Sequence, residues 1–115
     1  MENENIIEQT IKGLLQKTIE NKIPWKLVNP NAVRWIKTSA GTNITVTLQK
    51  QLHPVPSNSN YILTIQGPTP TTTNTQINSA IQPAYKVDLI KLFDAALQVG
   101  NSESIEVLKR LLDDL

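Results

Sequence analysis

Cysteine is absent from this sequence of 115 residues, and histidine occurs once. Without thiols there can be no disulfide framework, zinc ribbon, iron–sulfur site or cysteine nucleophile. Glycine is also scarce, with four residues, and none of the glycine-rich loops that cradle phosphates is present. The sequence therefore predicts no catalytic residues, no metal site and no cofactor.

Long hydrophobic runs are missing as well. No apolar run approaches the ~20 residues needed to cross a bilayer. The first residues lack the basic region and apolar stretch of a signal peptide. We therefore expect a cytoplasmic protein that does not enter a membrane. The formal net charge is only +1, and the length favours a single domain spanning residues 1–115.

Acidic residues are missing from the middle of the chain, between Glu20 and Asp88. Six cationic residues lie there without a local counter-charge: Lys22, Lys26, Arg34, Lys37, Lys50 and Lys86. One interpretation is a mildly basic sheet face that meets nucleic acid or an acidic partner. The other is a solvated face balanced by nearby acidic helices. Because Arg34 and Lys37 fall on opposite faces of a strand, these charges need not form one patch.

A helical spacing of three and four residues predicts an amphipathic helix over residues 3–22. Its apolar stripe is formed by Ile7, Ile11, Leu14, Leu15 and Ile19. Pro24 is expected to end this helix, because the residue before a proline is pushed out of the α region. Gly13 costs about 1 kcal/mol in a helix interior, which suggests a close neighbour there.

The same spacing predicts two more helices near the C-terminus. One covers residues 84–99 after Pro83, and Gly100 with Asn101 should end it. The other covers residues 102–115, with Ser102 as its cap.

Between residues 25 and 66 the period changes from 3.6 to 2. Alternation predicts strands over residues 32–37, 44–49 and 61–66, with a four-residue hairpin loop at 39–42. A polar strand face is formed by Thr45, Thr47, Gln49, Thr64 and Gln66. Residues 51–60 and 67–75, rich in proline and polar residues, are predicted loops. A further edge strand at residues 76–78 is left open.

These elements predict an α+β fold in the order α-β-β-β-α-α, with a three-stranded, or four-stranded, antiparallel sheet covered on one face by helices. The expected core comprises Ile7, Ile11, Leu14, Leu15, Trp35, Val46, Leu48, Leu63, Ile65, Leu89, Phe93 and Leu97. Trp25 and Trp35 are expected to lock the first helix to the sheet, although two tryptophans can also mark an interaction surface.

Candidates for chemistry are few. His53 stands in a predicted loop without a carboxylate nearby in the sequence. A histidine base or ligand needs an orienting partner, so we expect a solvent-facing side chain. Asp113 and Asp114 are adjacent at a helix end, where a fraying acidic terminus is expected.

The last predicted helix carries a stripe of Ile105, Leu108, Leu112 and Leu115, widened by Val107 and Leu111. A helix of ~14 residues is marginal alone in water, so this stripe should be buried. We expect it to dock on its own chain. A homodimer or a partner helix is the alternative, because the spacing also suits a coiled-coil seam.

The order of helix, tryptophan after proline, three-strand meander and Leu-Phe helix resembles small uncharacterised bacterial domains. The resemblance is carried by Ile23-Pro24-Trp25, Val33-Arg34-Trp35, the segment from Tyr61 to Ile65 and the segment from Leu89 to Phe93. It implies a stand-alone or effector-linked bacterial module, and no site follows from it.

The sequence thus favours a non-catalytic protein-interaction domain, with a protein partner or a homodimer. The alternative is a nucleic-acid-binding module that uses the acid-free segment. The expected interaction surface comprises Lys26, Arg34, Lys37, Lys50, Leu108 and Leu112.

Overall fold

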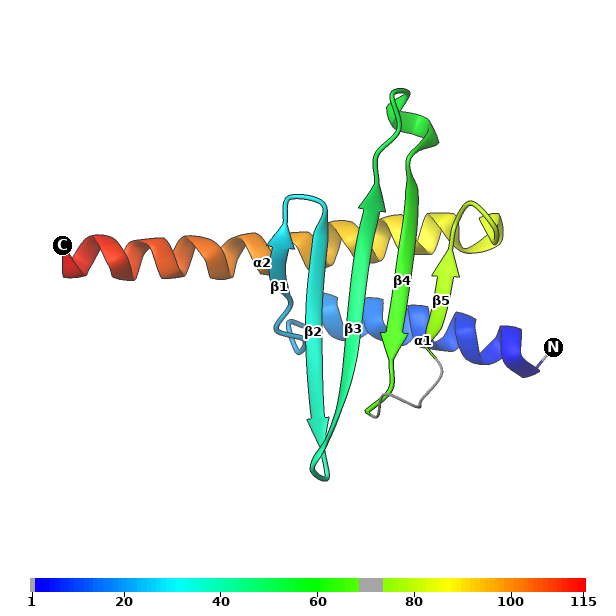
Figure 1. The fold of residues 1–115 in the computed structure, drawn as a ribbon, viewed down its shortest axis with the longest axis horizontal. Helices are drawn as coiled ribbons and strands as arrows, with labels where there is room; N and C mark the ends of the chain where they lie inside the picture. Colours follow the sequence, from blue (N-terminus) through cyan, green and yellow to red (C-terminus); the bar gives the residue numbers. More distant parts are fainter. Residues whose placement is uncertain (1, 69–73) are drawn as a thin grey trace.

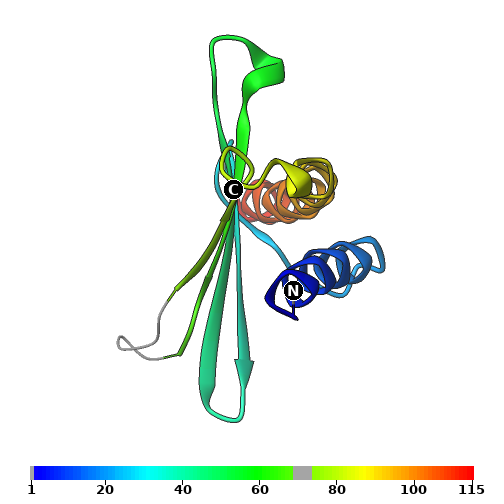
Figure 2. The ribbon, with the colours of Figure 1, turned by 90° about the vertical axis from the view of Figure 1, so that its right-hand side faces the viewer.

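The computed structural model describes residues 2–68 and 74–115. Their strands form one antiparallel sheet in chain order, β1-β2-β3-β4-β5. Both helices lie on the same face of this sheet and leave the other face open (Figures 1 and 2). The predicted α+β class, with helices on one face of the sheet, is confirmed.

The chain begins with α1 (Glu2–Ile19) and ends with α2 (Lys86–Asp114). The strands between them are β1 (Lys26–Asn29), β2 (Ala32–Ser39), β3 (Thr42–Gln51), β4 (Asn60–Gln66) and β5 (Thr75–Asn78). Short 3-10 helices precede β4 (Pro56–Asn58) and α2 (Pro83–Tyr85). The order is therefore α-β-β-β-β-β-α, which corrects the predicted three central strands and three helices. The strand that the sequence left open at 76–78 exists as β5, whereas β1 was not predicted.

The strand register explains why one sheet face is apolar. Val33 on β2 pairs with Leu48 on β3, Leu48 with Leu63 on β4, and Leu63 with Ile77 on β5. All four side chains are buried. Alternation then sends their neighbours to the open face.

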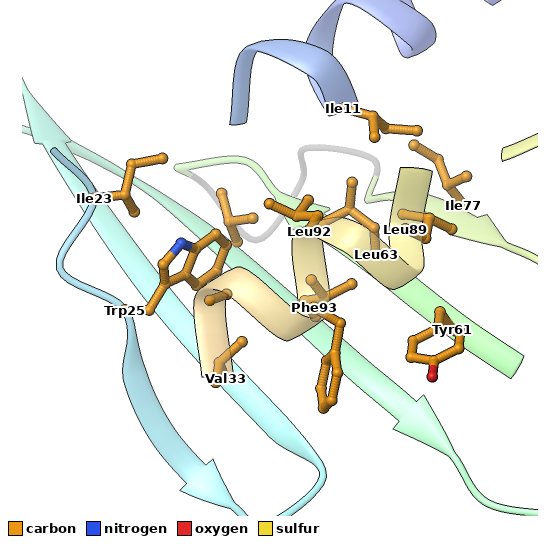
Figure 3. Packing of buried hydrophobic residues seen from close by; sticks show 13 residues of the cluster. Ile11, Ile23, Trp25, Val33, Tyr61, Leu63, Ile77, Leu89, Leu92 and Phe93 are labelled. Atoms are coloured by element: carbon orange, nitrogen blue, oxygen red, sulfur yellow. The ribbon is translucent and has the colours of Figure 1, made fainter. Parts of the chain in front are cut away.

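The core forms where this apolar row meets the two helices. Figure 3 shows Ile11 of α1, Leu89 and Leu92 of α2, and Leu63 and Ile77 of the strands close to one another. Every residue of the predicted core is buried or packs against the buried cluster. The core also includes Trp25, which was expected to lock the first helix to the sheet. Its members that were not predicted are Ile23, Val33, Tyr61, Ile77, Leu92 and Ala96.

Trp25 ties α1 to the sheet, as expected from the sequence. Its side chain is 0% exposed, and its Nε1 donates a hydrogen bond of 2.9 Å to Thr18 Oγ1. Thr18 in turn donates to the Leu14 carbonyl at 2.6 Å, so the buried polar groups of Trp25 and Thr18 both have hydrogen-bond partners. Trp35 is half-buried, with its ring centroid 6.3 Å from that of Trp25.

Helix α1 ends at Ile19, several residues before the position at which Pro24 would stop it. Asn21 has a φ of 62°. The amide of Asn21 bonds the Thr18 carbonyl and that of Lys22 bonds the Lys17 carbonyl, at 3.0 and 2.9 Å. This pair of bonds around a left-handed residue is the Schellman motif. The prediction that Pro24 ends the helix is therefore wrong.

The β2–β3 connection is also tighter than predicted. Ser39 pairs with Thr42, and the two residues between them, Ala40 and Gly41, have φ values of 52° and 78°. Positive φ at both central residues is the requirement of a type I′ turn. The hairpin loop therefore has two residues rather than four. Within the predicted loop at 67–75, residues 69–73 lie outside the described residues.

Helix α2 runs without a break through the predicted stop at Gly100 and Asn101. Gly100 is buried, and a Cβ built on it would lie 3.2 Å from the Leu27 backbone nitrogen of β1. Gly100 therefore allows a close approach between α2 and β1 and does not end the helix. At Gly13, where the sequence suggested such a neighbour, no described atom lies within 4 Å of that position.

The continuous helix makes the molecule elongated. Its extents are 55 × 43 × 27 Å and its radius of gyration is 15.3 Å. A compact domain of this length would have a radius of gyration of about 13 Å. Figure 1 shows α2 crossing behind the sheet and continuing well past β1.

Candidate interaction surfaces

The four cationic residues expected to form a surface do not lie together. Lys26 on β1 stands opposite Arg34 on β2, on the open face of the sheet. Lys37 and Lys50 occupy helix-facing positions of β2 and β3, because they alternate with Arg34 and Gln49. Lys37 is level with Ile44 on β3, six residues before Lys50, which separates the two lysines by about 20 Å.

Lys26 and Arg34 border a shallow groove at the sheet edge. The groove has a volume of about 490 Å³ and is lined by Pro24, Lys26, Leu27, Val28, Arg34, Trp35 and Ile36. Its lining is mostly apolar, and the described lining residues include two cations and no acid. Neither cation forms a salt bridge with any described residue. We call this hollow the edge groove.

Lys37 belongs to a second groove, between α1 and β2. This groove of about 540 Å³ is lined by Gln9, Thr10, Gly13, Leu14, Lys17, Lys22, Ile23, Trp35 and Lys37. Glu20 forms ion pairs with Lys22 at 3.1 Å and with Lys17 at 4.0 Å. A hydrogen bond from Gln16 and another from Lys22 hold the pKa of Glu20 below its ordinary value. Glu20 therefore offsets one of the three positive charges that line this groove.

Lys50 has a local partner. Its ammonium group lies 6.0 Å from the centroid of the Tyr61 ring, within reach of a cation–π contact. Tyr61 packs edge-on against Phe93 of α2, with centroids 5.5 Å apart. Lys50 therefore covers the end of the core.

Most side chains at the centre of the open sheet face, on β3 and β4, are polar and uncharged. Arg34, Thr47, Thr64 and Gln76 form one row across four strands. The five residues expected on a polar face share it: Thr45, Thr47, Gln49, Thr64 and Gln66. Such a surface suits an ordinary wet sheet face, because threonine is a good strand residue.

Leu108 and Leu112 lie on the part of α2 that extends beyond the sheet. We call residues 101–115 the projecting segment; at 1.5 Å per residue it is about 20 Å long. Its large apolar side chains are between 53% and 90% exposed: Ile105, Val107, Leu108, Leu111, Leu112 and Leu115. The expected docking of this helix on its own chain is therefore wrong.

These six side chains form a single face. At 100° per residue they fall within an arc of about 160°. The charged residues of the segment occupy the rest of the helix: Glu103, Glu106, Lys109, Arg110, Asp113 and Asp114. The projecting segment thus carries an exposed apolar face bordered by four acids and two bases.

The projecting segment stays helical without docking because it continues a helix that is already formed. Nucleation is the unfavourable step of helix formation, and the packed half of α2 provides the nucleus. Leu, Glu, Lys and Arg, which dominate the segment, are good helix formers. A separate helix of ~14 residues would have needed burial, whereas the continuation of α2 does not.

A third hollow joins the projecting segment to the sheet. It has a volume of about 400 Å³ and is lined by Lys26, Leu27, Gly100, Glu103, Ser104, Val107 and Leu108. We call it the root groove. Two residues of the apolar face, Val107 and Leu108, form part of its wall. The apolar face is therefore continuous with a hollow at the β1 edge, and Lys26 borders both the edge groove and the root groove.

His53 is the one histidine that the sequence offers for chemistry. His53 is exposed, and its Nδ1 accepts a hydrogen bond of 3.0 Å from the Val55 amide. Among the described residues no group of three or more His, Asp or Glu side chains could hold a metal ion. On α1, Lys12 and Glu8 form an exposed ion pair of 2.8 Å. The hydrogen bond from Lys12 to Glu8 raises the pKa of Lys12. None of the described helices is long and apolar enough to cross a membrane.

No protein family, curated protein or solved structure matches this chain. The surfaces must therefore be interpreted from their own geometry. The two leucines and the cations are predictable from the sequence, whereas the apolar residues Pro24, Val28 and Ile36 of the edge groove were not predicted. The missing signal was β1 itself, which brings Val28 and Lys26 beside β2.

Proposed function

We propose that this protein is a non-catalytic protein-interaction domain, and that its interaction element is the exposed apolar face of the projecting segment. The observation that carries the proposal is the exposure of six large apolar side chains on one arc of a helix. The sheet and α1 provide the folded base that holds this helix in place. The bacterial and cytoplasmic setting expected from the sequence stays a prediction.

The size of the face supports this proposal. A half-exposed leucine or isoleucine leaves on the order of 100 Å² of apolar surface in water, so the face presents about 600 Å². The largest apolar patch on a typical monomer is about 300–600 Å², and such patches are often functional. Isolated surface leucines would need no explanation, but a continuous helical face of this size does.

The nucleic-acid alternative lacks a comparable observation. It would be favoured by a cluster of Lys26, Arg34, Lys37 and Lys50, because phosphate contacts require several cations on one surface. In the structure only Lys26 and Arg34 are neighbours. Lys37 and Lys50 lie on the other face of the sheet, and Lys50 covers Tyr61.

Site-specific photo-crosslinking in cells that express the protein tests the proposal. A photoreactive phenylalanine analogue replaces Leu112 on the apolar face, or Glu106 on the opposite side of the same helix. We expect a discrete protein adduct from position 112 and none from position 106. Because both side chains are exposed, neither replacement should unfold the domain. Equal adducts at both positions, or none at either, would contradict the proposal.

A further inference from the structure

We propose that the partner of the exposed apolar face is a second copy of this chain, with the two projecting segments packed side by side and antiparallel. In this dimer the acidic tip of each segment reaches the root groove of the other copy. The inference rests on the proposed function, since it names the partner that the interaction element binds. Three features carry it: the area of the face, the distribution of charge and the position of the root groove.

The area is sufficient for a dimer. Two faces of about 600 Å² would together bury about 1,200 Å², which is the lower limit of stable protein–protein interfaces. The arc of about 160° is wider than the seam of a two-stranded coiled coil. A neighbouring helix alone would leave part of this arc in water. In the antiparallel arrangement the other copy's helix lies over the root groove. It therefore also covers Val107, which lies at the edge of the apolar face and forms part of the wall of that groove.

The charges select the orientation. In a parallel pair the two tips, each with Asp113 and Asp114, would lie at the same end of the dimer, and like charges brought close together are unfavourable. In an antiparallel pair with full overlap of residues 100–115, each tip lies beside the other copy's Gly100. Gly100 shares the root groove with Lys26.

The root groove carries a cation that can receive the acidic tip. Lys26 lines this groove and forms no salt bridge with a described residue. Glu103 is the one acid among the described residues that line the root groove. Lys26 there would meet Asp114 of the other copy, twice per dimer, because Asp114 borders the apolar face on the side of Val107. A two-fold axis relates the two contacts, so the interface closes on itself as a dimer.

The first experiment measures association of the purified full-length chain by sedimentation equilibrium over about 1–500 µM. We expect a mass twice that of one chain at the upper end. Replacing both Leu108→Ser and Leu112→Ser should weaken the dimer at least ~100-fold, because two central apolar contacts are lost. The matched control, Glu106→Ser with Lys109→Ser, alters the charged side of the same helix and should change the dissociation constant by less than about tenfold.

The outcomes separate the two proposals. A chain that stays monomeric throughout would overturn the dimer, while a discrete adduct of another protein at position 112 would still support the proposed function. A dimer that survives the paired leucine replacements would overturn the apolar face as its interface. Circular dichroism of each variant shows whether the fold is retained, and the exposed positions lead us to expect that it is.

The second experiment tests the orientation and uses the absence of cysteine from the chain. One batch carries Lys26→Cys and another carries Asp114→Cys, and they are oxidised separately and as a mixture. The antiparallel dimer should give a disulfide-linked pair from the mixture and little from Asp114→Cys alone. Rapid crosslinking of Asp114→Cys with itself, and none with Lys26→Cys, would show a parallel pair and overturn the proposed arrangement.

Discussion

Gly13 and Gly100 both stand inside helices, where glycine costs about 1 kcal/mol relative to alanine. Their surroundings differ. No described atom lies within 4 Å of a Cβ built at Gly13, whereas one at Gly100 would meet the Leu27 nitrogen at 3.2 Å. The cost at Gly100 therefore accompanies a close contact between α2 and β1. At Gly13 nothing in the described structure requires a glycine.

This contrast predicts opposite responses to alanine. Gly13→Ala should raise the free energy of unfolding by about 0.5–1 kcal/mol, because it removes backbone freedom from the unfolded chain. Gly100→Ala should be less favourable than Gly13→Ala by about 1 kcal/mol or more, since β1 must move to admit the methyl group. Urea unfolding of the two variants and the wild type measures both differences. Equal gains at the two positions would show that the close approach at Gly100 carries no constraint.

At the scale of elements, α1 ends through backbone geometry at Asn21. The left-handed conformation there costs most residues roughly 1–2 kcal/mol, while glycine adopts it freely and asparagine tolerates it. The two amide bonds of the Schellman motif depend on this residue. The turn also positions Ile23 and Trp25, both buried, below the helix.

Substitution of Asn21 tests this account. Asn21→Ala should lower the free energy of unfolding by about 1 kcal/mol, and Asn21→Gly should leave it unchanged or raise it. Because the Asn21 side chain is exposed, the difference reports on the backbone. Thermal unfolding followed by circular dichroism is sufficient. If alanine were tolerated as well as glycine, the Schellman motif would not be what ends α1.

Sequence patterns predicted the elements whose apolar residues repeat over several turns or strand pairs. The stripe from Ile7 to Ile19 gave α1, and the alternation around Val46 gave β3. They did not predict β1, because four residues between Pro24 and Pro30, paired through a bulge, are too few to show a period. The helix end predicted at Gly100 and Asn101 is also wrong. These two residues typically end helices, but here α2 continues because it packs on β1.

The candidate interaction surface was predictable only in part. The apolar stripe of Leu108 and Leu112 is visible in the sequence. Its exposure is not, because it depends on the continuation of α2 beyond the sheet after Gly100. The cations were identifiable by type. Their separation follows from strand alternation, which already placed Arg34 and Lys37 on opposite faces. The edge groove and the root groove could not be foreseen, because both need β1.

At the scale of the whole molecule, the fold has a packed half and an extended half. The sheet, α1 and the first part of α2 share one core. The projecting segment lies beyond it with every residue from Ile105 onward exposed. Stability and association should therefore be separable, since the residues that hold the fold are not those that form the apolar face.

Deletion of residues 105–115 tests that separation. At low protein concentration, where the full-length chain is monomeric, the deletion should shift the melting temperature by no more than about 2 °C, because it removes no core contact. As concentration rises, the melting temperature of the full-length chain should increase, since dimerisation stabilises the folded state by mass action. That of the shortened chain should stay constant. A loss of many degrees at every concentration would instead mean that the segment stabilises its own chain, which conflicts with the exposure of its apolar face.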